Sequence, residues 1–146
     1  MEAVQAICDF VNTADLEDGT DSLTNAACRD VREAIRTLLR ANNGVRSDIE
    51  GASRVLDEAA RHSGLRVGFA DGVLAFSSDE RDPLADVLAA VAETMAEGSW
   101  SRLKACRSDT CQWAFYDGAR NRSRQWCDMS VCGNRAKARR YRSRHA

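Results

Sequence analysis

Four of the six cysteines gather in the last third of the chain at positions that could hold a metal ion. Cys106 and Cys111 enclose four residues, and so do Cys127 and Cys132, which gives the spacing C-x4-C-x15-C-x4-C. A structural zinc ion takes four ligands in a tetrahedral arrangement, commonly supplied as two close cysteine pairs. The spacing therefore predicts that these four cysteines bind one structural Zn2+.

Three other uses of these cysteines stay open at this point. They could be four unliganded buried thiols, a redox switch in which disulfides replace the metal, or the ligands of an iron–sulfur cluster, although such clusters use other spacings. Cys8 and Cys28 have no partner at a metal-binding spacing. We interpret these two as ordinary buried thiols at apolar helix positions or beside them.

The segment that holds the cysteine pairs is also strongly basic. Residues 1–99 carry 9 Arg and Lys against 19 Asp and Glu, whereas residues 100–146 carry 12 against 3. Such a concentration of guanidinium groups is typical of nucleic-acid-binding proteins, because these groups bind phosphates. We predict that the nucleic-acid-binding residues are Arg120, Arg122, Arg124, Arg135, Lys137, Arg139, Arg140, Arg142 and Arg144.

The basic tail has two other interpretations. It could be a solvated helix without a partner, or it could neutralise the acidic N-terminal segment. Aromatic residues in the same segment could stack on bases, but in so small a module we expect them to pack in the core. These aromatic residues are Trp113, Phe115, Tyr116 and Trp126.

Hydrophobic periodicity predicts that residues 1–99 are mostly helical. Apolar residues recur at helical spacing over residues 4–11, 23–39 and 49–60, and again over 84–95 after the helix-start signal Asp82-Pro83. Ser47 and Glu50 have the spacing of a capping box, which places the start of the third helix at Ser47. Between the third and fourth helices, Asp71-Gly72 separates two apolar runs and predicts a β-hairpin.

The register of this hairpin follows from its two-residue turn. It places Phe69 opposite Leu74 and Val67 opposite Phe76, so that four apolar side chains share one face.

These patterns together predict an α+β protein with two domains. Residues 1–99 form a mostly helical domain with a β-hairpin, and residues 100–146 form a small treble-clef-like zinc finger that ends in a basic helix. We expect a hairpin between the cysteine pairs with its turn at Asp117-Gly118, and a helix that starts near Cys132. Gly133 is expected to form a sharp turn that lets backbone N–H groups approach the Cys132 sulfur.

The motifs resemble a known family. Cys132-Gly133-Asn134-Arg135 spells CGNR, and "WCDMSVCGNRAKARRYRSR" is similar to the signature of CGNR zinc-finger proteins. "DFVNT" at residues 9–13 and "DPLADVL" at residues 82–88 resemble the ABATE domain that accompanies this finger. The resemblance implies a bacterial, stress-induced transcription regulator in which the four cysteines bind zinc and the finger binds DNA.

We therefore expect a zinc-dependent DNA-binding transcription regulator. A protein-interaction adaptor and an RNA-binding module are the alternatives, since basic charge suits acidic proteins and both nucleic acids. We expect a cytoplasmic protein, because no signal peptide and no apolar run of membrane-spanning length occur in the sequence. We also expect that it can form a homodimer, because a regulator that reads palindromic DNA needs two copies of its DNA-binding part. We expect no enzymatic activity, because the sequence has no nucleophile elbow or phosphate-binding glycine loop, and four thiolates leave zinc no open position.

Overall fold

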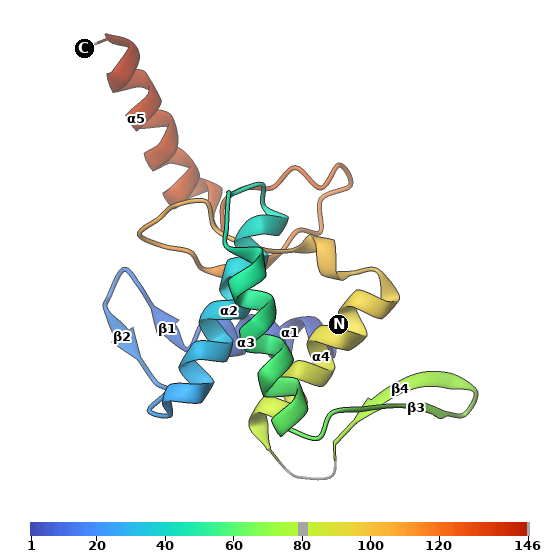
Figure 1. Ribbon diagram of the computed structural model, residues 1–146. Coiled ribbons are helices and arrows are strands. Elements are labelled where there is room, and N and C mark those ends of the chain that lie inside the picture. Colours follow the sequence, from blue (N-terminus) through green and yellow to red (C-terminus); the bar gives the residue numbers. More distant parts are fainter. Residues whose placement is uncertain (79–81, 146) are drawn as a thin grey trace.

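A computed structural model describes residues 1–78 and 82–145, so that residue 146, the last of the predicted finger, lies outside the described residues. The helices are α1 (Glu2–Val11), α2 (Ala26–Asn42), α3 (Ile49–His62), α4 (Pro83–Glu97) and α5 (Asn134–His145). Short 3-10 and π-helical turns cover Trp100–Arg102 and Met129–Gly133. Figure 1 shows the helices α1 to α4 as one group, with α5 at the far end of the molecule.

Within residues 1–78 and 82–145 the strands form three antiparallel pairs. They are β1 (Ala14–Asp15) with β2 (Thr20–Asp21), β3 (Arg66–Ala70) with β4 (Val73–Ser77), and β5 (Leu103–Ala105) with β6 (Ala114–Tyr116). The predicted α+β class, with a mostly helical N-terminal part and a four-cysteine region that ends in a helix, is confirmed.

Side-chain caps set the starts of α3 and α4. The carboxylate of Asp82 accepts a hydrogen bond from the Leu84 N–H at 3.0 Å, as the Asp-Pro signal predicts. The predicted cap at Ser47 is wrong, because the carboxylate of Asp48 accepts from the Gly51 N–H at 2.9 Å and α3 begins one residue later. A carboxylate satisfies the first N–H groups and also faces the positive end of the helix dipole, which favours Asp48 over its neighbour.

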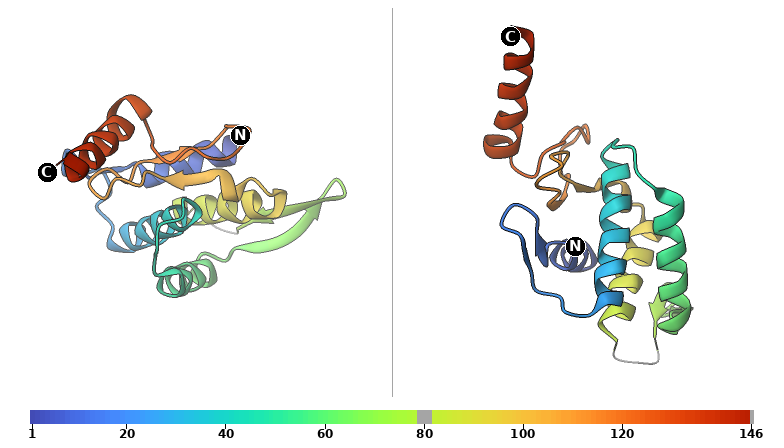
Figure 2. Two further views of the ribbon diagram at one scale, coloured as in Figure 1. Left: turned by 90° about the horizontal axis from the view of Figure 1, so that it is seen from above. Right: turned by 60° about the vertical axis from the view of Figure 1, so that its left-hand side comes forward.

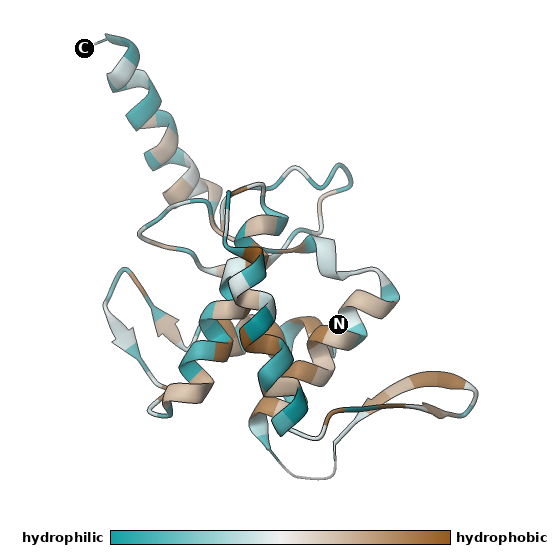
Figure 3. Ribbon diagram, viewed as in Figure 1, coloured by the Kyte–Doolittle hydropathy of each residue, from teal (hydrophilic) through white to brown (hydrophobic). Residues whose placement is uncertain are grey.

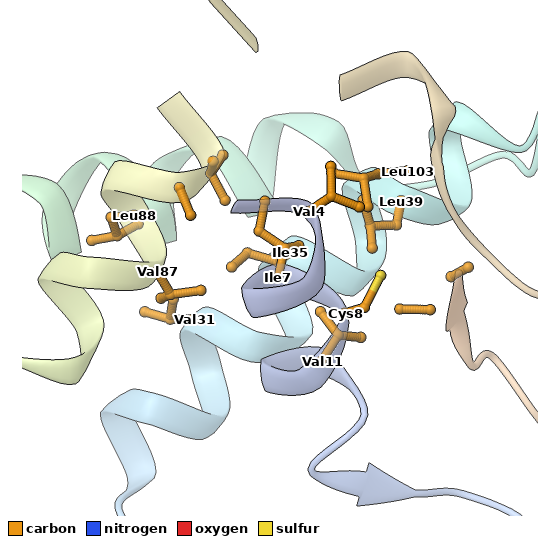
Figure 4. Close-up of a cluster of buried hydrophobic side chains, with 14 residues drawn as sticks. Val4, Ile7, Cys8, Val11, Val31, Ile35, Leu39, Val87, Leu88 and Leu103 are labelled. Carbon is orange, nitrogen blue, oxygen red and sulfur yellow. The ribbon is translucent and has the colours of Figure 1, made fainter. Parts of the chain in front are cut away.

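The main hydrophobic core lies where α1, α2 and α4 meet. Figure 4 shows the apolar side chains of these helices pointing toward one another. Ile7, Ile35 and Leu39 have no exposed surface, and each such burial contributes about 1.5–3 kcal/mol. Helix α3 covers the outer side of α2 and contributes partly buried side chains such as Leu56.

Strands from the cysteine-rich region enter the same core. Leu103 and Ala105 on β5 have no exposed surface and pack with Ala114 of β6 against the helices. The helical part and the start of the cysteine-rich region therefore share one hydrophobic core. The division of the chain into domains 1–99 and 100–146 stays a prediction.

The β3–β4 hairpin has the predicted register but lies largely outside this core. Phe69 pairs with Leu74 and Val67 with Phe76. Phe69 is 79% exposed and Val67 66%, and Figure 3 shows the hairpin as an apolar arm that extends from the helices. The hairpin thus presents apolar side chains to solvent.

None of the helices that the structure describes is both long and apolar enough to span a membrane.

A buried arginine on α2 binds the carboxylate at the end of β2. Arg32 is 4% exposed, and its guanidinium donates two hydrogen bonds to the Asp21 carboxylate at 2.6 and 2.9 Å. The Arg32 bonds, together with the Leu23 N–H, lower the pKa of Asp21 from 3.8 to about 2. The ionised carboxylate is therefore the form that the folded protein stabilises.

This ion pair makes part of the stability depend on pH. Because the pKa of Asp21 is about 2 in the folded protein and 3.8 without its partners, the stabilisation is complete above pH 4 and is lost as the pH falls toward 2. We predict that Asp21→Asn lowers the melting temperature at pH 7, and that the difference from the wild type shrinks as the pH falls below 4 and is mostly lost at pH 2. Thermal unfolding at a series of pH values checks this, and Asp57→Asn on α3 is the control. An Asp21→Asn difference that is constant between pH 7 and pH 2 would contradict the assignment.

Candidate metal centre

Each of the four clustered cysteines is positioned by a different local structure. Cys106 follows β5 directly, and its N–H donates to the Trp113 carbonyl at 2.9 Å, which closes the turn that brings Cys111 back to it. Cys127 lies at the end of the long loop after β6, and Cys132 lies in the π-helical turn that precedes α5. Of the predicted plan of a cysteine turn, a hairpin and a helix start, the cysteine turn and the helix start are present.

The distances between the sulfur atoms fit a tetrahedral zinc ion. All four Sγ atoms lie within 4.8 Å of one another. The Cys111–Cys127 and Cys127–Cys132 separations are 3.6 and 3.8 Å. A tetrahedral site with Zn–S bonds of about 2.3 Å places its sulfur atoms about 3.8 Å apart. The four cysteines that the sequence singled out are therefore compatible with a structural zinc ion.

Without a cation, the clustered cysteines are more stable as neutral thiols than as thiolates. Burial raises the pKa of Cys132 to about 12, and neighbouring cysteines add to the shift. Burial and the adjacent Cys111 raise the pKa of Cys127 as well. Thiolates are the metal-binding form, so Zn2+ would supply the positive charge that makes several thiolates stable at this separation.

Amide side chains from the helical part hold the first cysteine turn in place. The Asn12 side chain pairs with β6 like an additional strand, since it accepts from the Ala114 N–H at 2.8 Å and donates to the Ala114 carbonyl at 3.0 Å. The buried Asn43 side chain donates to the Ala105 and Gln125 carbonyls at 2.9 and 2.8 Å. Asn43 thereby joins the strand before the first cysteine pair to the loop before the second.

A buried arginine adds a third attachment. Arg36 on α2 is 2% exposed and donates to the carbonyl of Gln112, next to Cys111, at 2.8 Å. The same guanidinium donates to the Val11 carbonyl at 2.9 Å. Arg36 therefore connects the end of α1, the middle of α2 and the first cysteine turn.

The loop between the cysteine pairs is held by a buried ion pair rather than by a hairpin. Lys104 and Asp117 lie 2.7 Å apart and are 6% and 0% exposed. The Lys104 ammonium also donates to the Arg122 and Arg124 carbonyls at 2.7 and 3.0 Å.

The predicted hairpin with a turn at Asp117-Gly118 is therefore wrong. The observed hairpin, β5–β6, encloses the first cysteine pair instead, and β6 ends at Tyr116. The Asp117 carboxylate accepts from the N–H groups of Ala119 and Arg124, each at 3.0 Å. The Asp117 carboxylate thus holds the loop around Lys104. An Asp-Gly pair often forms a tight turn, but here the Asp side chain stabilises a longer loop.

The helix start at the second cysteine pair differs in one detail from the prediction. Asp128 caps the π-helical turn, because its carboxylate accepts from the Ser130 N–H at 2.8 Å. Gly133 lies inside this helical turn and does not have the positive φ of a sharp turn. A Cβ at Gly133 would collide with the Met129 side chain, so the glycine provides room for that side chain.

The predicted nucleic-acid-binding residues fall into two groups. Among the described residues, those of α5 beyond its first turn have no ion-pair partner: Lys137, Arg139, Arg140, Arg142 and Arg144. Arg135, at the start of α5, forms an ion pair with Glu17 in the β1–β2 loop. Figure 1 and the right-hand view of Figure 2 show α5 extending away from the other helices.

The three arginines of the loop are placed apart from this helix. Arg124 donates to the Trp126 and Cys127 carbonyls and lies over the Phe115 ring at 4.5 Å, so it has a structural role. Arg122 lies 3.5 Å from the Ser101 hydroxyl, and Arg120 is exposed.

The aromatic side chains mostly pack, as expected. Phe115 is buried, Tyr116 packs against the main core, and Trp126 packs against the cysteine cluster. Trp113, by contrast, is 37% exposed. Of the other two cysteines, Cys8 is buried in the main core and Cys28 is half-buried.

Several residues that build the centre were not singled out from the sequence. Asn12 is named only within the DFVNT resemblance, and Asn43 lies beyond the apolar run that predicts the second helix. Lys104 lies shortly before Cys106 and Arg107 directly follows it. Their position next to a predicted metal ligand was the one sequence feature that could have indicated a role in building the centre.

Comparison with known proteins agrees with this geometry. Residues 102–145 match the family model of the CGNR zinc finger. The match covers β5, β6, all four clustered cysteines and α5. No curated protein matches the chain. The ABATE resemblance of the N-terminal part stays a prediction.

Loss of one zinc ligand tests the centre directly. We predict that Cys132→Ser loses bound zinc and unfolds residues around α5, because structural zinc contributes about 10–16 kcal/mol to the folding of zinc-finger peptides. Zinc content by mass spectrometry and amide hydrogen exchange measure the two effects. Cys28→Ser is the matched control and should keep its zinc. Full zinc content in Cys132→Ser would show that this cysteine is not a ligand.

The Lys104–Asp117 ion pair should contribute to the stability of the protein. Lys104→Met leaves the Asp117 carboxylate buried without its partner, which should lower the free energy of unfolding by about 3–5 kcal/mol. Chemical denaturation of the zinc-loaded protein measures the loss. The double variant Lys104→Met/Asp117→Leu should recover part of it, because no buried charge then lacks a partner. A single variant as stable as the wild type would show that the pair does not hold the loop.

Proposed function

We propose that this protein is a zinc-dependent, DNA-binding transcription regulator, and that it acts in the bacterial stress response that its CGNR and ABATE resemblances suggest. The observation that supports the proposal is the positive charge of α5. Five basic residues of this helix have no ion-pair partner among the described residues, and the helix begins at the cysteine cluster. A helix that only added solubility would not need attachment to a metal centre at its first turn.

The dimensions of α5 suit a nucleic-acid partner. Its 12 residues span about 18 Å, and a helix fits the major groove of B-DNA, which is about 12 Å wide. Arg and Lys side chains on several sides of the helix reach phosphates on both edges of the groove. The high charge and low apolar content of α5 favour phosphate contacts over an apolar protein interface (Figure 3).

In this proposal zinc is structural. Cys106, Cys111, Cys127 and Cys132 would fill its four positions, which leaves no site for a water molecule, so the proposal includes no catalytic step. The metal instead fixes where α5 leaves the body of the protein. DNA binding should therefore depend on zinc even though zinc does not contact DNA.

The N-terminal part is proposed to regulate the finger and to dimerise. A dimer places two recognition helices on two half-sites, which suits palindromic operators. The exposed apolar side chains of β3–β4, including Val67 and Phe69, are a surface that supports self-association. Sedimentation of the zinc-loaded protein measures this directly.

The DNA-binding proposal predicts a strong dependence on salt and zinc. If the five basic residues of α5 each contact a phosphate, affinity for a 20-bp duplex should fall about 500-fold between 50 and 200 mM salt. Chelation of zinc should abolish binding, whereas chelator already saturated with zinc should not. Fluorescence anisotropy of a labelled duplex measures both effects.

Matched variants and competitors sharpen this test. Replacing Lys137, Arg142 and Arg144 by Ala should weaken binding about 1,000-fold or more, since each lost phosphate contact costs about 1.5 kcal/mol or more. Replacing Arg46, Arg54 and Arg61 in the helical part changes the net charge equally and should have little effect. Tighter binding to RNA than to DNA would reject the DNA assignment. No binding to either at 50 mM salt would favour a protein partner.

A further inference from the structure

A cleft of about 550 Å3 lies between α5 and the first cysteine turn. One face of α5 forms one wall, with Ala136, Arg139, Arg140 and Ser143 at the spacing i, i+3, i+4, i+7. The small side chains of Ala136 and Ser143 leave room along the middle of this face. The opposite wall belongs to the body of the finger and includes Arg107 and Trp126.

The wall opposite α5 is held by several hydrogen bonds. The Arg107 side chain donates through Nε to the Asn43 carbonyl at 2.8 Å, and its backbone N–H donates to the Gln125 carbonyl at 3.2 Å. Trp126 follows Gln125 and packs against the cysteine cluster. Arg107 and Trp126 therefore have defined positions before any ligand binds, which reduces the entropy lost on binding.

The charges of the cleft favour an anion. Arg107, Arg139 and Arg140 line it, and Asp109 is the one carboxylate among the described lining residues. Asp109 is paired with Arg40, whose Nη2 lies 2.6 Å from the carboxylate, and this bond lowers the pKa of Asp109. The guanidinium groups of the cleft therefore exceed its negative charge.

The kinds of side chain in the cleft indicate a nucleotide unit. Planar guanidinium groups bind phosphate oxygens in pairs, and an indole ring provides a flat apolar surface for a sugar or a base. The volume lies within the range of about 300–1,000 Å3 found for small-ligand sites.

We propose that this cleft binds a phosphodiester of the nucleic-acid backbone, with Arg107, Arg139 and Arg140 on the phosphate and Trp126 against the adjoining nucleoside. The inference rests on the proposed function and deepens it. It adds a residue outside the tail, Arg107, to the binding surface. It also assigns Arg139 and Arg140 to a cleft that they share with the finger, while Lys137, Arg142 and Arg144 lie elsewhere on the exposed surface of α5.

Substitutions in the two walls test the cleft. Arg107→Ala and Arg139→Ala should each weaken binding of the zinc-loaded protein to a 20-bp duplex about tenfold, and each should reduce the slope of log K against log salt by about one. Arg54→Ala removes an exposed cation from α3 and is the charge-matched control. Melting temperature and zinc content identify any variant that has lost its fold. If Arg107→Ala folds and binds like Arg54→Ala, the cleft assignment is wrong.

A variant with the opposite effect separates charge from structure. Asp109→Asn removes the carboxylate from the cleft and should tighten duplex binding a few-fold, a gain that damage to the fold would not produce. Arg107→Lys keeps the positive charge but loses the planar set of guanidinium donors. Its affinity for the duplex should therefore lie between those of Arg107→Ala and the wild type. Unchanged affinity in Asp109→Asn would contradict a phosphate at this position.

A small probe distinguishes failure of the cleft from failure of the proposed function. Titration of the zinc-loaded protein with the dinucleotide pTpT should shift the Arg107 Nε–H signal in NMR spectra and change the Trp126 fluorescence, identified by its loss in Trp126→Phe. Saturable shifts without duplex binding would keep the cleft and overturn the DNA-binding proposal. Duplex binding with no pTpT response and no effect of Arg107→Ala would overturn the cleft alone.

Discussion

The close approach of four sulfur atoms is the constraint on which the C-terminal third of the molecule depends. All four lie within 4.8 Å of one another in a partly buried place, where burial favours neutral thiols over thiolates. A divalent cation would reverse this preference, because its positive charge attracts all four thiolates and outweighs their repulsion of one another. The chain around the cluster, which has few aliphatic side chains of its own, is folded to fit that one ion.

The helical part of the protein supplies much of what holds the cysteines in position. Asn12, Arg36 and Asn43 belong to α1, α2 and the loops that follow them, yet their polar groups bind backbone atoms of the finger. Leu103 and Ala105 also place the first strand of the finger in the main core. Metal binding and packing of the helices are thus physically connected.

The sequence was sufficient for features that depend on local rules. The register of the hairpin around Asp71-Gly72, the cap at Asp82 and the four clustered cysteines all follow from short-range spacing. The loop after β6 could not be predicted in this way, because Asp117 in this loop pairs with Lys104, which lies on β5. Asn12 and Asn43 were missed for the same reason, since their partners are distant in the sequence and local patterns contain no information about them.

The placement of the arginines shows why charge alone is an incomplete guide to a binding surface. Arg124 and Arg135 belong to the same basic segment as Arg139, but the first supports the loop and the second pairs with Glu17. Their guanidinium groups already have partners, so a phosphate would have to compete for them. Arg107 lies outside the tail and still faces the same cleft as Arg139. Arg107 uses its Nε in a bond to the Asn43 carbonyl, so the surface available to an anion is set by which guanidinium N–H groups the fold leaves unused. The cysteine cluster at the start of α5 determines where the groups of that helix lie.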